Sequence, residues 1–237
     1  MNDEQLWLYT IAKKNGLLIT DIQLAALYTY KTLLLDWNQK INLVSRKDVE
    51  NAWKNHIAFS LTMLFKIEFL DTIKILDLGT GGGFPGIPLS MMLPHCSFLL
   101  LDSTQKKVAA VQAMIDDLKL PNANTVWGRA EELNRNDKYR NSFDAIVARS
   151  VSNLSNLLEW GMPFLTRVNR GIKKNLIPEK IGITTPSLIT FKGGETEEEE
   201  IVAKKKFPNV KLQIIPLTFH GSEEFENHDK KLVIATL

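Results

Sequence analysis

A run of glycines that follows a short apolar segment constrains the fold of this chain more than any other feature. The run reads KILDLGTGGGFPGIPL over residues 74–89. Ile73, Ile75, Leu76 and Leu78 at its start have the apolar character of a short strand buried on both faces. The glycines allow a ligand to approach the backbone closely, and Pro85 and Pro88 suit the first turn of a helix. A strand, a glycine turn and a helix start predict a cradle for a nucleotide-type cofactor, with backbone N–H groups facing an anionic group.

The glycine spacing alone leaves the cofactor open. Gly81, Gly83 and Gly86 also satisfy G-x-G-x-x-G, the fingerprint of dinucleotide-binding proteins. Asp102 ends the next apolar run, and an acid at about this distance, some 20 residues on, holds the ribose hydroxyls of such cofactors. Asp77 precedes the glycines, and there a carboxylate would repel a pyrophosphate in a poorly screened site. A cofactor with a cationic centre and no phosphate fits this carboxylate better.

The segment D-L-G-T-G-G-G at 77–83 resembles motif I of the S-adenosylmethionine (SAM) methyltransferases. Their cofactor carries an ammonium and a sulfonium group. This resemblance favours SAM over NAD, and it implies cofactor contacts at Asp77, Gly79, Gly81 and Gly83.

Composition indicates an ordinary globular protein. Of the 237 residues 44% are hydrophobic and 24% charged, and the net charge of +2 permits a nucleic-acid partner without requiring one. The single cysteine, Cys96, excludes a disulfide or a cysteine zinc site within the chain. The N-terminal residues lack the pattern of a secretory signal, and no apolar run reaches the roughly 18 residues of a membrane span. We expect a cytoplasmic monomer with no metal site and no membrane contact.

The order of the predicted elements divides the chain in two. Residues 1–70 have helical periodicity and predict an N-terminal extension packed on the main domain. Residues 71–237 alternate strands and helices, which predicts an α/β domain with a mostly parallel sheet. The strands are expected at 74–77, 97–101, 124–127, 143–148 and 187–191, with an antiparallel edge hairpin formed by 210–216 and 231–235.

Three other segments allow more than one interpretation. Residues 42–45 suit the end of one helix and the start of the next, with a capping box from Ser45 to Asp48, or substrate contacts; the first is favoured. His56, on a helix predicted from 47 to 65, is more often a hydrogen-bonded structural residue than a catalyst. The stretch 166–180 carries five basic residues and one acid, which suits a solvated loop or a loop that contacts phosphates.

Several segments together resemble the glucose-inhibited division protein B family, the bacterial 16S rRNA (guanine-N7) methyltransferases. The unbroken G-T-G-G-G-F-P-G-I-P-L at 79–89 is the most specific of them. The others, in the family's order, are W-N-x-x-x-N-L-x-S at 37–45, H-I at 56–57, L-D-S at 101–103, R-A-E at 129–131, A-R at 148–149 and F-K-G at 191–193. Many members read R-H-I-x-D-S where this chain has Asn55 and Phe59.

The resemblance implies a Rossmann-like, SAM-dependent methyltransferase fold with a helical N-terminal piece. It implies SAM contacts at Gly79, Phe84, Asp102, Ala130, Glu131 and Arg149. It also implies catalytic or RNA-contacting basic residues at Arg129, Arg149 and Lys192. The expected partner is 16S rRNA or the assembling small ribosomal subunit.

Guanine N7 has a lone pair and no proton, so its methylation requires no general base. Orientation of N7 against the methyl group alone supplies roughly 7–11 kcal/mol. The sequence agrees, because no cysteine follows the fourth predicted strand, as cytosine-C5 chemistry would require, and no Asn/Asp-Pro-Pro-aromatic turn stands there for amine methylation. Methylation makes the base cationic, so Arg129, Arg149 and Lys192 are expected on phosphates, guanine O6 or the SAM carboxylate.

Two other functions remain open at this point. An NAD-dependent oxidoreductase would use the same glycine turn, and titration with NADH and SAM separates it from a methyltransferase. An RNA-binding protein that kept the fold without catalysis would bind rRNA but transfer no methyl group.

Overall fold

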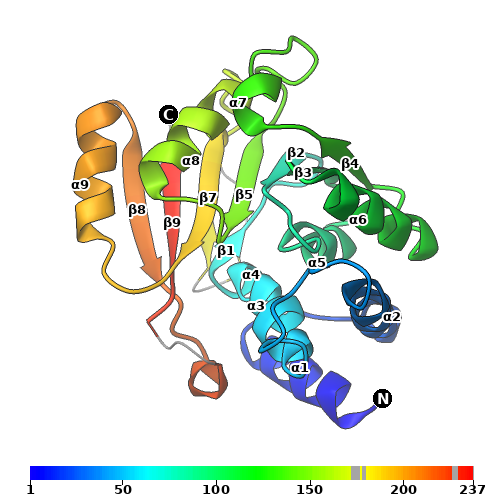
Figure 1. Cartoon of the computed structure of the whole chain (residues 1–237). Helices are drawn as coiled ribbons and strands as arrows, with labels where there is room; N and C mark the ends of the chain where they lie inside the picture. Colours follow the sequence, from blue (N-terminus) through cyan, green and yellow to red (C-terminus); the bar gives the residue numbers. More distant parts are fainter. Residues whose placement is uncertain (172–176, 178–179, 226–228, 237) are drawn as a thin grey trace.

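The computed structural model describes residues 1–171, 177, 180–225 and 229–236. A 7-stranded sheet with the order β4-β3-β2-β5-β7-β9-β8 forms its centre (Figure 1). The strands are β2 (Lys74–Leu78), β3 (Ser97–Asp102), β4 (Ala123–Trp127), β5 (Ala145–Arg149), β7 (Ser187–Lys192), β8 (Lys211–Pro216) and β9 (Lys231–Thr236). The predicted α/β architecture with a mostly parallel sheet is confirmed.

The antiparallel edge differs from a simple hairpin in its strand order. Strand β9 runs antiparallel to both β7 and β8 and lies between them, so β8 forms the edge of the sheet. The burial of the two strands explains this order. Four successive residues of β9, Leu232 to Ala235, are buried, as in an interior strand, whereas most residues of β8 are exposed or half-buried.

Helices cover both faces of the sheet because alternate residues of each strand point to opposite sides. Ile75 of β2 packs with the N-terminal helices, α5 (Gly86–Met92) and α6 (Gln105–Asp117). Leu76 and Leu78 of the same strand pack on the other face. That face is covered by α7 (Ala130–Leu133), α8 (Leu154–Gly161) and α9 (Glu197–Lys206). In α9 acids fill the first turn and lysines the last, the arrangement that complements the helix dipole.

The N-terminal residues form helices that pack against α5 and the sheet (Figure 1). They are α1 (Asp3–Lys14), α2 (Asp21–Asn38), the π-helical turn η1 (Trp53–Ala58), α3 (Phe59–Leu61) and α4 (Met63–Lys66). Capping boxes start α1 and α2, from Asn2 to Gln5 and from Thr20 to Gln23.

The helix expected from residue 47 begins only at Trp53, and the capping box from Ser45 to Asp48 was a wrong prediction. Residues 47–51 form turns instead. The Ser45 hydroxyl donates to the Asp48 carboxylate at 2.5 Å and accepts no bond from the backbone N–H of Asp48, so it does not cap a helix.

The remaining elements are short. They are β1 (Ile67–Glu68), which pairs with β6 (Ile181–Gly182), and the 3₁₀ turns η2 (Met162–Phe164) and η3 (Ser222–Glu224). Part of the basic stretch 166–180, including Lys173 and Lys174, lies outside the described residues. Within the described ranges, no helix combines the length and apolar character needed to cross a membrane.

Candidate cofactor and substrate site

The glycine loop after β2 divides into an open side and a packed side. Gly79, Gly81 and Gly83 have φ values of +76°, +59° and +104°, which side chains rarely tolerate. A Cβ atom on Gly81 would have no neighbour within 4 Å, so the loop is open there. A Cβ on Gly83 would lie 2.7 Å from the Ile87 side chain and 2.8 Å from the Tyr30 hydroxyl. Gly81 therefore leaves room for a ligand, and Gly83 allows close packing below it.

Asp102 joins the loop to the neighbouring strand. Its carboxylate is buried and accepts hydrogen bonds from the backbone N–H groups of Gly81 (2.9 Å) and Thr104 (2.8 Å). These two bonds use one lone pair on each oxygen, so both oxygens can still accept a ribose hydroxyl. Ala130 and Glu131 start α7 after the next strand, β4. The carboxyl ends of β2, β3 and β4 thus bring the predicted cofactor residues into a row, the usual place for a ligand in such sheets.

Asp77 lies in β2, one residue before the strand ends, and its carboxyl group binds residues of the glycine loop. Its carboxyl group is fully buried; Oδ2 accepts from the Thr80 hydroxyl (2.6 Å) and the Gly86 N–H (2.9 Å). Oδ1 has no donor among the described residues. Burial raises the pKa of Asp77 to about 7. A cationic cofactor group nearby fits this carboxylate, and a pyrophosphate does not.

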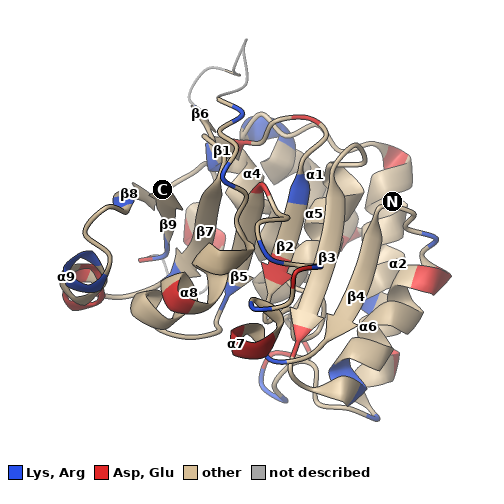
Figure 2. Ribbon diagram, turned by 90° about the horizontal axis from the view of Figure 1, so that it is seen from above, with Lys and Arg blue, Asp and Glu red and all other residues tan. Residues whose placement is uncertain are grey.

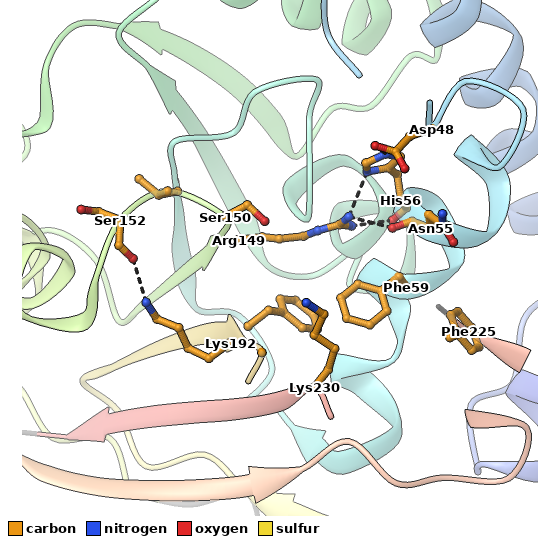
Figure 3. A pocket seen from close by; sticks show the side chains of 13 residues that line it. Asp48, Asn55, His56, Phe59, Arg149, Ser150, Ser152, Lys192, Phe225 and Lys230 are labelled. Carbon is orange, nitrogen blue, oxygen red and sulfur yellow. Dashed lines mark hydrogen bonds and ion pairs between the residues drawn. The ribbon is translucent and has the colours of Figure 1, made fainter. Parts of the chain in front are cut away.

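A second feature, the pocket at the ends of β5 and β7, has a volume of about 510 Å³ (Figure 3). We call it the aromatic pocket, because Phe59, Phe191 and Phe225 form part of its wall. The ring centroids of Phe59 and Phe191 are 5.0 Å apart, and those of Phe59 and Phe225 are 6.2 Å apart. Its cationic residues are Arg149, Lys192 and Lys230. Aromatic faces beside cations suit a nucleotide base with its phosphate.

Arg149 connects the sheet to the N-terminal helices. Its guanidinium donates to the carbonyls of Asn55 (2.7 Å) and His56 (3.1 Å) and contacts the His56 Nδ1 (2.9 Å), as Figure 3 shows. It also lies over the ring of Phe59, at 5.0 Å from the centroid. Burial lowers the pKa of Arg149 to about 10, which leaves it charged at neutral pH. Asn55 and Phe59, where the chain departs from the family pattern, thus both contact this guanidinium.

His56 is the hydrogen-bonded histidine that the sequence indicated. Burial, and next the charge of Arg149, lower its pKa to about 4. The ring is therefore neutral at physiological pH, and Nδ1 acts as an acceptor for Arg149. On its other side the ring packs against Phe84 at 5.1 Å between centroids, and Phe84 also packs on Tyr30. Phe84 thus connects the glycine loop with the aromatic pocket.

The Lys192 ammonium is fixed by two hydrogen-bond acceptors. Its ammonium donates to the Ser152 carbonyl (2.8 Å) and to the Glu199 carboxylate (2.7 Å). The same Glu199 oxygen accepts the N–H of Leu154 at 2.8 Å. These bonds fix the segment 150–154, in which Ser150 has a φ of +55°, unusual for a residue with a side chain. Lys192 therefore shapes the wall of the pocket.

The structure brings together two of the three predicted basic residues. Arg149 and Lys192 end neighbouring strands and line the same pocket. Arg129 is exposed after β4, three positions from β5 in the strand order, and does not line the pocket. In Figure 2, both basic (blue) and acidic (red) segments of the ribbon are visible around the sheet.

Sequence reasoning missed Phe225 and Lys230 as pocket residues. The only available signal was their place just before the last strand. That signal becomes useful only when β9 is known to lie beside β7, where Lys192 pairs with Lys231. Among the described residues, no group of three or more His, Cys, Asp or Glu side chains could hold a metal ion.

Comparison with known sequences gives one consistent family. Residues 23–172 match the GidB family, described as rRNA small subunit methyltransferase G. Ribosomal RNA small subunit methyltransferase G of Pelodictyon phaeoclathratiforme is 38% identical over 240 residues, covering 99% of this chain and 94% of that protein. The protein of the same name from Phocaeicola vulgatus is 39% identical, covering 91% of this chain and 90% of its own.

Solved structures support the fold. A fibrillarin/Nop5p complex matches with a TM-score of 0.54 and 12% identity, covering 77% of this chain and 81% of that one. A SAM-dependent methyltransferase from Aquifex aeolicus matches with a TM-score of 0.50 and 16% identity, covering 74% and 88%. The fold is thus the Rossmann-like fold of SAM-dependent methyltransferases, with an antiparallel edge and N-terminal helices.

Proposed function

Because the chain belongs to the rRNA small subunit methyltransferase G (GidB) family, we propose that it transfers the methyl group of SAM to N7 of a guanine in 16S rRNA. One observation carries the proposal. The cofactor loop and the aromatic pocket lie next to each other at the carboxyl ends of the strands, joined by the contact of Phe84 with His56. A cofactor and a base bound there would meet between β2 and β5, where the strand order reverses.

We assign the cofactor contacts as follows. The open side of the loop at Gly81 would take the cofactor, with Asp102 on the ribose hydroxyls and Ala130 and Glu131 near the adenine. Asp77 would favour the cationic methionine part through its spare oxygen. When bound, SAM supplies an electrophilic methyl group on a sulfonium.

The aromatic pocket would hold the guanine by stacking. Phe59 and Phe191 line the pocket and would contact the base, and base–aromatic stacking contributes about 1–3 kcal/mol per base. Arg149 donates to Asn55 and His56, which keeps its charge directed away from a base that becomes cationic. His56 would keep Arg149 in place through Nδ1. It would not act as a base, because guanine N7 carries no proton to remove. The chain's contribution is therefore orientation.

The proposed function extends to the domain organisation, the substrate and the oligomeric state. Residues 1–70 would form an extension on a methyltransferase domain of residues 71–237, and η1 would complete the pocket. The substrate would be free 16S rRNA or the assembling small subunit in the cytoplasm. We propose that the enzyme is a monomer.

The decisive test is methyl transfer from radiolabelled SAM to small-subunit rRNA, both as free RNA and as subunits from a strain that lacks the enzyme. We expect incorporation, and chain cleavage at N7-methylguanine by borohydride and aniline. Tight binding of NADH without binding of SAM would support the oxidoreductase instead. Binding of rRNA without transfer would support a non-catalytic protein.

We expect Asp102→Ala to weaken SAM binding at least tenfold. A charged hydrogen-bond acceptor contributes about 1.5–3 kcal/mol, and the variant also frees the N–H of Gly81. Calorimetric titration with SAM measures the effect, with Asp117→Ala on the exposed end of α6 as the charge-matched control. An unchanged affinity in a folded Asp102→Ala protein would contradict the assignment.

The affinity for SAM should rise with pH up to about neutrality. In the free protein the pKa of Asp77 is about 7 because its carboxyl group is buried. A cationic ligand favours the ionised carboxylate, so binding at lower pH must release a proton, and affinity falls as pH decreases below 7. Calorimetry in two buffers of different ionisation enthalpy at pH 6.5 measures this proton release. Asp77→Asn should abolish it, and equal proton release in that variant would assign the proton to another group.

A further inference from the structure

Lys230 enters the aromatic pocket from a fixed backbone position. It stands directly before β9, and its carbonyl accepts the N–H of Leu217 at 2.9 Å. The adjacent Asp229 carboxylate accepts the N–H of Gly194 at 2.7 Å. From this anchored position the half-buried side chain extends beside Phe59 (Figure 3).

Gly193 leaves the space that this side chain occupies. A Cβ atom on Gly193 would lie 2.5 Å from the Lys230 Nζ and 3.0 Å from its Cδ. The backbone of Gly193 is not in the left-handed region, so an alanine there is free of backbone strain. A side chain at position 193 would therefore displace the lysine and leave the fold as it is.

Lys230 differs from the other two cations of the pocket in its partners. The charge of Lys192 is neutralised by Glu199, and the donors of Arg149 point to carbonyls and the neutral His56. Lys230 makes no ion pair or hydrogen bond through its ammonium among the described residues. It is the cation of this pocket whose donors are open to an anionic ligand.

We propose that Lys230 binds a phosphate group of the nucleotide to be methylated, with Gly193 keeping that site open. The inference rests on the proposed function of the pocket. An ammonium is a compact, strongly hydrated charge that suits a phosphate, whereas contact with the base would oppose the positive charge that N7 methylation creates.

The test uses the full-length protein with Lys230→Met, Gly193→Ala and the double variant. For Lys230→Met we expect a roughly tenfold higher Kd and KM for the rRNA substrate. The slope of log Kd against log salt should fall by about 0.7–0.9. The Kd for SAM should not change. Lys205→Met, on the exposed face of α9, removes the same charge outside the pocket and should have little effect.

Gly193→Ala separates position from charge, because it moves Lys230 without changing the net charge. We expect a rise in RNA Kd similar to that of Lys230→Met. The double variant should be no weaker than Lys230→Met alone, since both changes remove one contact. Full additivity, or a wild-type Kd for Gly193→Ala, would overturn the proposed site.

The two proposals fail in different ways. If the wild-type protein methylates rRNA and Lys230→Met retains its Kd, KM and salt slope, the phosphate site is wrong and the methyltransferase function stands. If the wild-type protein binds rRNA without methylating it, the proposed function is wrong. The RNA Kd and salt slope of Lys230→Met then still decide whether Lys230 binds phosphate.

Discussion

Replacing Gly81 with valine should lower the affinity for SAM by at least about 100-fold, with the fold retained. The position has a φ of +59°, and its Cβ direction points into space with no atom within 4 Å. A branched side chain would fill the open side of the loop, where the cofactor must approach the backbone. It would also tilt the N–H that Asp102 accepts at 2.9 Å. Calorimetric titration of the purified variant with SAM measures the loss.

The control must reproduce the backbone strain without touching the cofactor loop. Gly16, in the turn after α1, has a φ of +68°, and a Cβ there would have only ordinary contacts at 3.7 Å. Gly16→Val should therefore cost about the same 1–2 kcal/mol of stability and bind SAM normally. Equal loss of SAM binding in both variants would trace the effect to strain. Normal binding by Gly81→Val would make the glycine turn purely structural.

The parts of the fold that the sequence predicted are those in which local pattern and tertiary structure agree. Residues 98–101 and 145–148 are unbroken apolar runs, and only Asp77 interrupts the run at 75–78; the interior of a parallel sheet buries such runs on both faces. The position of β9 between β7 and β8 was not predicted, because it depends on the pairing of Lys231–Thr236 with a strand about 40 residues away.

The candidate site also has a part that the local sequence predicts and a part that depends on contacts between distant segments. Asp77, Gly81 and Asp102 belong to one strand–loop–strand unit, so their spacing in sequence reflects their position in space. Carbonyl partners of Arg149 come from η1, and the carboxylate partner of Lys192, Glu199, comes from α9. No local pattern links position 149 to position 55, and the π-helical turn that presents the Asn55 and His56 carbonyls has no sequence signature. Whether Arg129, Arg149 and Lys192 contact RNA remains a prediction.

Replacing Arg149 with methionine should reduce methyl transfer to rRNA by about 100-fold. The variant leaves the buried acceptors of Asn55 and His56 without their donor, and loss of a charged hydrogen bond costs roughly 1.5–3 kcal/mol. The wall of the aromatic pocket formed by η1 then loses its connection to β5. Arg149→Lys should recover little, because an ammonium cannot reach the separate acceptors as the guanidinium fork does. Steady-state kinetics with SAM and rRNA measure both variants.

The pKa of His56 gives a second, independent measurement of this connection. The positive charge of Arg149 contributes to lowering that pKa to about 4, after burial. In Arg149→Met the pKa should rise towards the ordinary value near 6.5, which NMR titration of the histidine ring measures. The exposed Arg140 provides the matched control, Arg140→Met, and should leave both transfer and the His56 pKa unchanged. If Arg149→Met retains wild-type transfer while the His56 pKa rises, the contact exists but catalysis does not depend on it.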